Sequence, residues 1–125
     1  MIKPDNASLL AAALLMLTAS GTTSAGEVRI VAADFRNTDA NRWSVSVTLQ
    51  HADTGWDHYA DDWRVVDGQG NILGDRVLLH PHVDEQPFTR SQSGLEIPDG
   101  TDTVTVRAHD LVDGYGGQTI NVDLN

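Results

Sequence analysis

Cysteine is absent from the whole 125-residue sequence, and both methionines, Met1 and Met16, lie near its N-terminus. The lack of cysteine excludes disulfide bonds and metal sites built on thiolates. A domain that follows Met16 can offer a metal ion only nitrogen and oxygen atoms, chiefly from histidine, aspartate and glutamate. It must also be held together by its apolar core alone, which about 100 residues suffice to build.

Positive charge is scarce as well. Lys3 is the only lysine, and eight basic residues stand against 18 acidic ones, which gives a net charge of −10. A surface this acidic repels nucleic acids and anionic lipid head groups, and it attracts cations weakly. We therefore expect no nucleic-acid partner.

No apolar run is long enough to span a membrane. The longest one, residues 9–17, covers about nine residues, whereas a bilayer needs about 20. Lys3 precedes this run, and Thr23 and Ala25 supply the small residues of a cleavage site before Gly26, as is typical of signal peptides. We predict a signal peptide over residues 1–25, with no cysteine at its cleavage site to carry a lipid, and one domain over residues 26–125. The processed protein is then periplasmic or secreted, without a membrane span.

The domain is predicted to be all-β. Within residues 43–50, apolar side chains from Trp43 to Leu49 alternate with serine, threonine and glutamine, a period of two that turns one set toward a core. Turn-forming clusters such as residues 67–71 and 98–101 separate further short apolar segments. About seven such strands in about 100 residues predict a single immunoglobulin-like antiparallel β-sandwich. The expected strands cover residues 28–35, 43–50, 63–66, 72–79, 88–97, 103–108 and 119–124.

One connection also fits a short helix. Trp56, Tyr59 and Trp63 recur at helical spacing, and Thr54 precedes them as a candidate N-terminal cap. One or two helical turns here would place His58 four residues before Asp62, so that the two side chains could pair. The fold class would stay the same.

Five histidines fall at strand ends or in connections. In a sandwich of alternating up-and-down strands, the second, fourth and sixth strands end at the same end of the molecule. All five histidines follow these strands directly or lie in the connections after them, provided that no strand has been missed. The set consists of His51, His58, His80, His82 and His109.

The chemistry of this set predicts a metal site. His80 and His82 are two residues apart in a segment that Pro81 stiffens, so their side chains point the same way and could hold one ion. His51 and His109 would complete four-coordination, and His58 joins if its connection folds back. Neutral imidazole is the usual nitrogen ligand of Zn²⁺ and Cu²⁺, which we expect as the bound ion. Nearby carboxylates could be ligands or could orient the rings, namely Asp53, Asp57, Asp84, Glu85 and Asp110.

Other functions stay open at this point. Each histidine taken singly could be a solvated loop residue, and the whole cluster could sense acid. Trp56 and Tyr59 could form a stacking platform, which would make the domain an envelope module that binds a protein or a glycan without a metal. Ser91 has no positioned base in the sequence pattern, and a metal-dependent enzyme would need an open coordination position, so binding is favoured over catalysis.

Two segments carry a resemblance. Residues 51–63, HADTGWDHYADDW, and residues 78–91, LLHPHVDEQPFTRS, resemble a family of small exported bacterial proteins without an assigned function. Strand number and spacing over most of residues 27–125 resemble immunoglobulin-like and fibronectin-type-III-like sandwiches. The resemblance implies that the two segments act as a unit, and it implies no activity.

Overall fold

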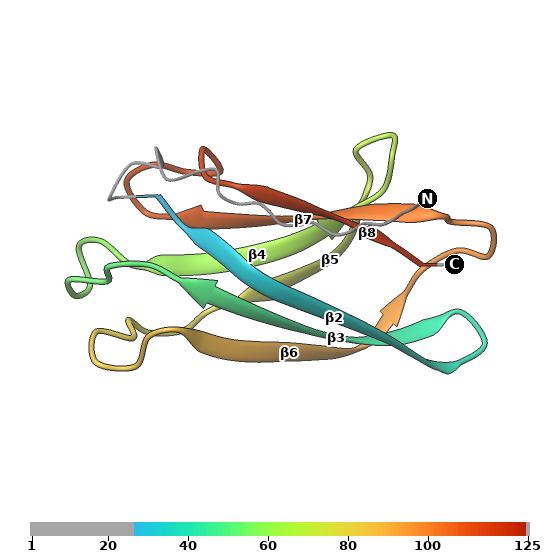
Figure 1. Ribbon diagram of the computed structural model, residues 1–125, viewed down its shortest axis with the longest axis horizontal. Coiled ribbons are helices and arrows are strands. Elements are labelled where there is room, and N and C mark those ends of the chain that lie inside the picture. The colour runs from blue at the N-terminus through green and yellow to red at the C-terminus, as the bar shows by residue number, and fades with distance from the viewer. Residues whose placement is uncertain (1–26, 125) are drawn as a thin grey trace, which may run out of the picture.

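The computed structural model describes residues 27–124, which fold into seven strands (Figure 1). The predicted signal peptide, residues 1–25, lies outside the described residues. None of the described chain forms a helix with the length and apolarity needed to cross a membrane. The strands are β2 (Arg29–Asp39), β3 (Arg42–Gln50), β4 (Ala60–Val66), β5 (Ile72–Val77), β6 (Phe88–Glu96), β7 (Thr103–Asp110) and β8 (Thr119–Asp123).

The strands form two antiparallel sheets. One sheet has the order β2-β3-β6 and the other the order β5-β4-β7-β8. This confirms the prediction of an all-β sandwich of seven strands. The fourth strand, β5, pairs with β4, whereas in constant-type immunoglobulin domains the fourth strand lies in the sheet of the first, second and fifth.

The core forms between the two sheets because alternate side chains of each strand turn inward. Val45 and Val47 of β3 meet Trp63 of β4 and Val106 of β7, and all four are buried. Burial of each such aliphatic side chain contributes about 1.5–3 kcal/mol. The outward residues of β3 pair with β6 through hydroxyls, as between Ser46 Oγ and Ser91 Oγ at 2.7 Å.

The connection between β3 and β4 contains no helix, so that expectation is wrong. Residues 55–58 instead make a tight turn, in which the Thr54 N–H donates to the His58 carbonyl at 3.0 Å and the His58 N–H to the Gly55 carbonyl at 3.2 Å. Gly55 has a φ of 144°, which no helix accommodates. His58 consequently pairs with Asp110 rather than with Asp62.

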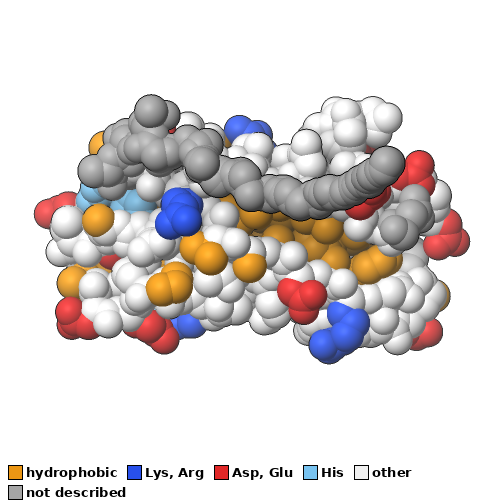
Figure 2. All heavy atoms as spheres, in the orientation of Figure 1, with side chains coloured by type: hydrophobic (Ala, Val, Ile, Leu, Met, Phe, Trp, Pro, Cys, Tyr) orange, Lys and Arg blue, Asp and Glu red, His pale blue; other side chains and the backbone are white. Residues whose placement is uncertain are grey.

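Three connections gather at one end of the sandwich. The β3–β4, β5–β6 and β7–β8 connections all lie on the left in Figure 1, as the strand count predicts. Figure 2 shows histidine side chains at the same end. Strand β7 runs to Asp110, two residues further than expected, so His109 and Asp110 belong to the strand itself.

Candidate metal centre

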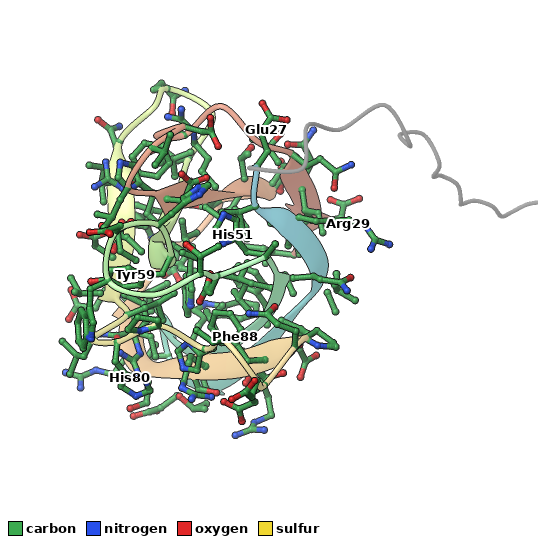
Figure 3. All side chains as sticks on the ribbon, turned by 90° about the vertical axis from the view of Figure 1, so that its left-hand side faces the viewer. Glu27, Arg29, His51, Tyr59, His80 and Phe88 are labelled. Carbon is green, nitrogen blue, oxygen red and sulfur yellow. The ribbon has the colours of Figure 1, made fainter. Side chains whose placement is uncertain are left out.

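His51 is the first residue after β3 and its side chain is fully buried (Figure 3). Its Nδ1 lies 2.5 Å from Asp53 Oδ1. A carboxylate only accepts hydrogen bonds, so Nδ1 of His51 is the donor in this contact. The Nε2 atom faces Asp110 Oδ2 at 3.6 Å. A metal-ligating histidine usually donates its other ring N–H to a carboxylate in this way.

Asp53, which fixes that ring, accepts hydrogen bonds from three groups. Beyond His51, its carboxylate accepts the Ala60 N–H at 3.0 Å and the His82 N–H at 2.7 Å. Burial on its own would raise the pKa of Asp53, but the hydrogen bonds from His51 and the two backbone groups outweigh it and lower the pKa. Asp53 is therefore charged and joins the β3–β4 connection to the β5–β6 connection.

Asp110 is the last residue of β7 and has no exposed surface. Its Oδ1 accepts the N–H groups of Val112 at 2.8 Å and Asp113 at 2.7 Å, which shapes the turn after the strand. Its Oδ2 is buried without a hydrogen-bond partner among the described residues. A buried carboxylate oxygen left unpaired is costly, so this atom favours a nearby cation.

His58 completes a group of three. Its Nε2 donates to Asp110 Oδ1 at 3.1 Å and lies 3.7 Å from Asp113 Oδ2, so a metal ion bound at this nitrogen would replace its proton. Its ring meets the His51 ring edge to face, with centroids 4.7 Å apart. One ligand atom from each of His51, His58 and Asp110 lies within 4.8 Å of the other two. Two imidazoles and a carboxylate suit Zn²⁺ or Cu²⁺, and bonds of about 2.0–2.2 Å would require these atoms to draw slightly closer.

His80 and His82 are neighbours, with ring centroids 4.6 Å apart, but neither belongs to that group. The His82 ring stacks on Phe88 at 3.9 Å, and its Nε2 accepts a hydrogen bond from Arg90 Nη2 at 2.8 Å. Burial, the Arg90 guanidinium and His80 lower the pKa of His82, so its ring is neutral. A cation already faces the nitrogen that a metal would use. In Figure 3, His80 lies well away from His51.

His109 also lies outside the group. Alternation along β7 turns Ala108 and Asp110 inward and His109 outward. There His109 Nδ1 lies 2.5 Å from Asp61 Oδ1, and its ring contacts Tyr115 with centroids 4.7 Å apart. Of the five predicted histidines, the structure therefore brings His51 and His58 together.

A second polar network covers the outer face of the larger sheet. The Tyr115 hydroxyl donates to Asp62 Oδ2 at 2.7 Å, and the guanidinium groups of Arg64 and Arg107 each lie 4.7 Å from the centre of its ring. Burial and the neighbouring Asp75 carboxyl raise the pKa of Asp62 to about 7. Burial and Asp62 raise the pKa of Tyr115, so the phenol stays a donor.

The sequence pattern assigned no role to several residues around the candidate centre. Asp113 Oδ2 lies 3.7 Å from His58 Nε2, and the Tyr115 ring contacts His109. Gln86 accepts the His51 N–H at 2.9 Å and donates to the His82 carbonyl at 2.8 Å. The spacing of Asp110 and Asp113 was an available signal, because an aspartate often accepts backbone N–H groups two and three residues ahead.

Comparison with known proteins identifies a relative in sequence but no family. No family model matches the chain, and no solved structure matches it. A curated protein of Halomicrobium mukohataei named "Putative lipoprotein" is 45% identical over 97 residues. The match covers 78% of this chain and 47% of that protein, so the chain spans about half the length of the relative.

Proposed function

We propose that this protein is an exported binding protein for a divalent transition metal ion, Zn²⁺ or Cu²⁺, with His51, His58 and Asp110 as ligands. The observation that carries the proposal is the buried Asp110 Oδ2, which has no hydrogen-bond partner within residues 27–124 and faces His51 Nε2 at 3.6 Å. A bound ion would compensate the charge of that oxygen. No thiolate or thioether lies in the domain, which favours these ions over Cu⁺.

The surroundings of His51 support the same proposal. Metal-ligating histidines usually donate their other ring N–H to a carboxylate, which fixes the ring and its tautomer. Asp53 does this for His51, and Asp53 is itself fixed by backbone N–H groups from Ala60 and His82. The ligand is thus already oriented before an ion arrives.

Export is part of the proposal. The predicted signal peptide over residues 1–25 supports a periplasmic or secreted location. The relative is named as a lipoprotein, and lipoproteins are exported to the cell envelope, which supports the same location. A site without cysteine or methionine is not exposed to thiol or thioether oxidation in these compartments.

Calorimetric titration of the purified protein with Zn²⁺ and Cu²⁺ tests the proposal. We expect binding tighter than about 10 μM and its loss in a His51→Ala/His58→Ala variant. His80→Ala is the matched control, since His80 is an exposed histidine at the same end, and it should bind as the unchanged protein does. Weaker binding than this limit, or equal binding by the double variant, contradicts the proposal.

A groove at the same end of the sandwich favours a second candidate function, the binding of a glycan. Trp56 is 67% exposed, and its indole contacts Tyr59 edge to face at 5.6 Å. A sugar ring could lie on such an indole while its hydroxyls bond to the carboxylates of Asp84 and Glu85. The groove has a volume of about 550 Å³ and is lined by Gly55, Trp56, His80, Pro81, His82, Val83, Asp84 and Glu85.

Glycan capture by the purified protein separates the two candidates. Trp56→Ala removes an exposed ring and should leave folding intact, while abolishing capture if the groove binds a sugar. The His51→Ala/His58→Ala variant should then still capture the glycan. Capture that survives Trp56→Ala excludes this groove as the glycan site.

A further inference from the structure

The metal centre has a buried inner wall and a partly exposed outer rim. The side chains of His51 and Asp110 have no exposed surface. The His58 side chain is 22% exposed, and that of Asp113 is 31% exposed. An ion that comes from solvent therefore reaches His58 and Asp113 before it reaches the other two residues.

Asp113 is held at this rim by a ligand of the centre. Its N–H donates to Asp110 Oδ1 at 2.7 Å. The turn is closed by the hydrogen bonds between the backbones of Asp110 and Gly114, at 3.0 and 3.2 Å. Because Oδ1 of Asp110 holds this turn, Oδ2 can bind an ion without releasing it. The backbone of Asp113 is thus fixed, and only its side chain needs to rotate.

The side chain of Asp113 already lies close to one ligand atom. Its Oδ2 is 3.7 Å from His58 Nε2, which is near the separation of two ligands on one tetrahedral ion. His51, His58 and Asp110 supply three ligands, and a closed zinc site takes four. A rotation of the exposed Asp113 carboxylate toward His58 would supply the fourth.

We propose that Asp113 is the fourth ligand of the centre and closes it on the solvent side. This inference rests on the metal-binding function proposed above. Two imidazoles and two carboxylates then surround the ion and leave no open position for a substrate. The centre would hold its ion rather than catalyse a reaction, since catalytic zinc sites keep a position open for water or substrate.

Asp113→Asn tests this assignment, with Asp84→Asn as the matched control because Asp84 is an exposed aspartate at the same end. Zn²⁺ affinity and release are measured on the purified protein by competition with a chelator. We expect Asp113→Asn to weaken binding on the order of 10- to 100-fold and to speed release, whereas Asp84→Asn changes neither. X-ray absorption of the zinc-loaded protein should show four nitrogen and oxygen neighbours, two of them from imidazole rings.

The outcomes distinguish the role of Asp113 as a ligand from the proposed metal-binding function. Tight Zn²⁺ binding that Asp113→Asn leaves unchanged overturns Asp113 as a ligand and leaves the metal-binding function standing. A protein that binds no Zn²⁺ overturns both. Thermal unfolding of the metal-free variant checks the fold, and we expect it to match the unchanged protein because the Asp113 N–H bond to Asp110 is retained.

Discussion

His51 Nε2 and Asp110 Oδ2 face each other at 3.6 Å, with both side chains fully buried. His51 follows β3 of the smaller sheet, and Asp110 ends β7 of the larger one. The pair therefore spans the two layers of the sandwich at the end where three connections gather. Much of what can be tested about this protein depends on what lies between these two atoms.

A bound ion should stabilise the folded protein. An ion that binds only the native state at about 100 times its dissociation constant adds about 2.7 kcal/mol, which raises Tm by roughly 10–20 °C for a domain of this size. Differential scanning calorimetry with and without Zn²⁺ measures the shift. A chelator should reverse it, and a His51→Ala/His58→Ala variant should show none.

Replacements of Asp110 should distinguish the roles of its two carboxylate oxygens. Asp110→Ala removes the acceptor of the Val112 and Asp113 N–H groups and should lower the free energy of unfolding by about 1–3 kcal/mol. Asp110→Asn keeps a carbonyl oxygen for these donors and removes a buried charge, so we expect the metal-free variant to be as stable as the unchanged protein or more so. Neither variant should gain stability from Zn²⁺. Chemical denaturation of both variants provides the comparison, and a gain by Asp110→Asn in the presence of Zn²⁺ would exclude Asp110 as a ligand.

Asp53→Asn should weaken metal binding although Asp53 is not itself a ligand. The amide can present its nitrogen to His51 Nδ1 and favour the wrong tautomer, so we expect a loss of about 10- to 100-fold in Zn²⁺ affinity. Calorimetric titration at a temperature where the variant is folded measures it. Asp57→Asn, at an exposed aspartate in the same connection, is the control and should bind normally.

Stability should fall as the pH rises from about 4 to about 7, because of Asp62. Its folded pKa of about 7 lies above the unfolded value of 3.8, so the folded state binds the proton more tightly and loses that advantage as the proton leaves. The carboxyl faces Asp75, Arg64 and Tyr115, and of these Asp75 opposes its ionisation most directly. Asp53, whose pKa is lowered, acts in the opposite direction and only at more acidic pH.

Asp62→Asn should remove this dependence and stabilise the protein at about pH 8 relative to the unchanged chain, because the amide stays neutral. Denaturant midpoints at about pH 5 and about pH 8 give the measurement, with Asp99→Asn as an exposed control. An unchanged slope in Asp62→Asn would assign the pH dependence to other groups.

The sequence predicted the strands of the sandwich and the end of the molecule where the histidines lie, because periods of two and turn clusters are local signals. It could not choose between His109 and Asp110, since that choice depends on β7 running two residues further and on which of the two turns inward. The pairing of His80 with His82 followed from local geometry. The contacts of His82 with Phe88 and Arg90 come from β6, and no local pattern reports them.

The error over residues 54–63 has a similar origin. Trp56, Tyr59 and Trp63 fit a helical period, but their side chains lie in different environments. Trp63 is fully buried by the alternation of β4, whereas Trp56 is 67% exposed. A spacing of three and four residues carries no information on whether its members share a face when a turn such as residues 55–58 interrupts them.

The two strands that His51 and Asp110 connect, β3 and β7, are the second and sixth of the sandwich. In antibody domains a disulfide bond joins these same two strands against a buried tryptophan of the third strand, and here Trp63 of β4 is buried in the third. A metal ion between His51 and Asp110 would give a cysteine-free domain an equivalent cross-link. Such a cross-link would form and dissolve with the supply of metal rather than with the redox state of the compartment.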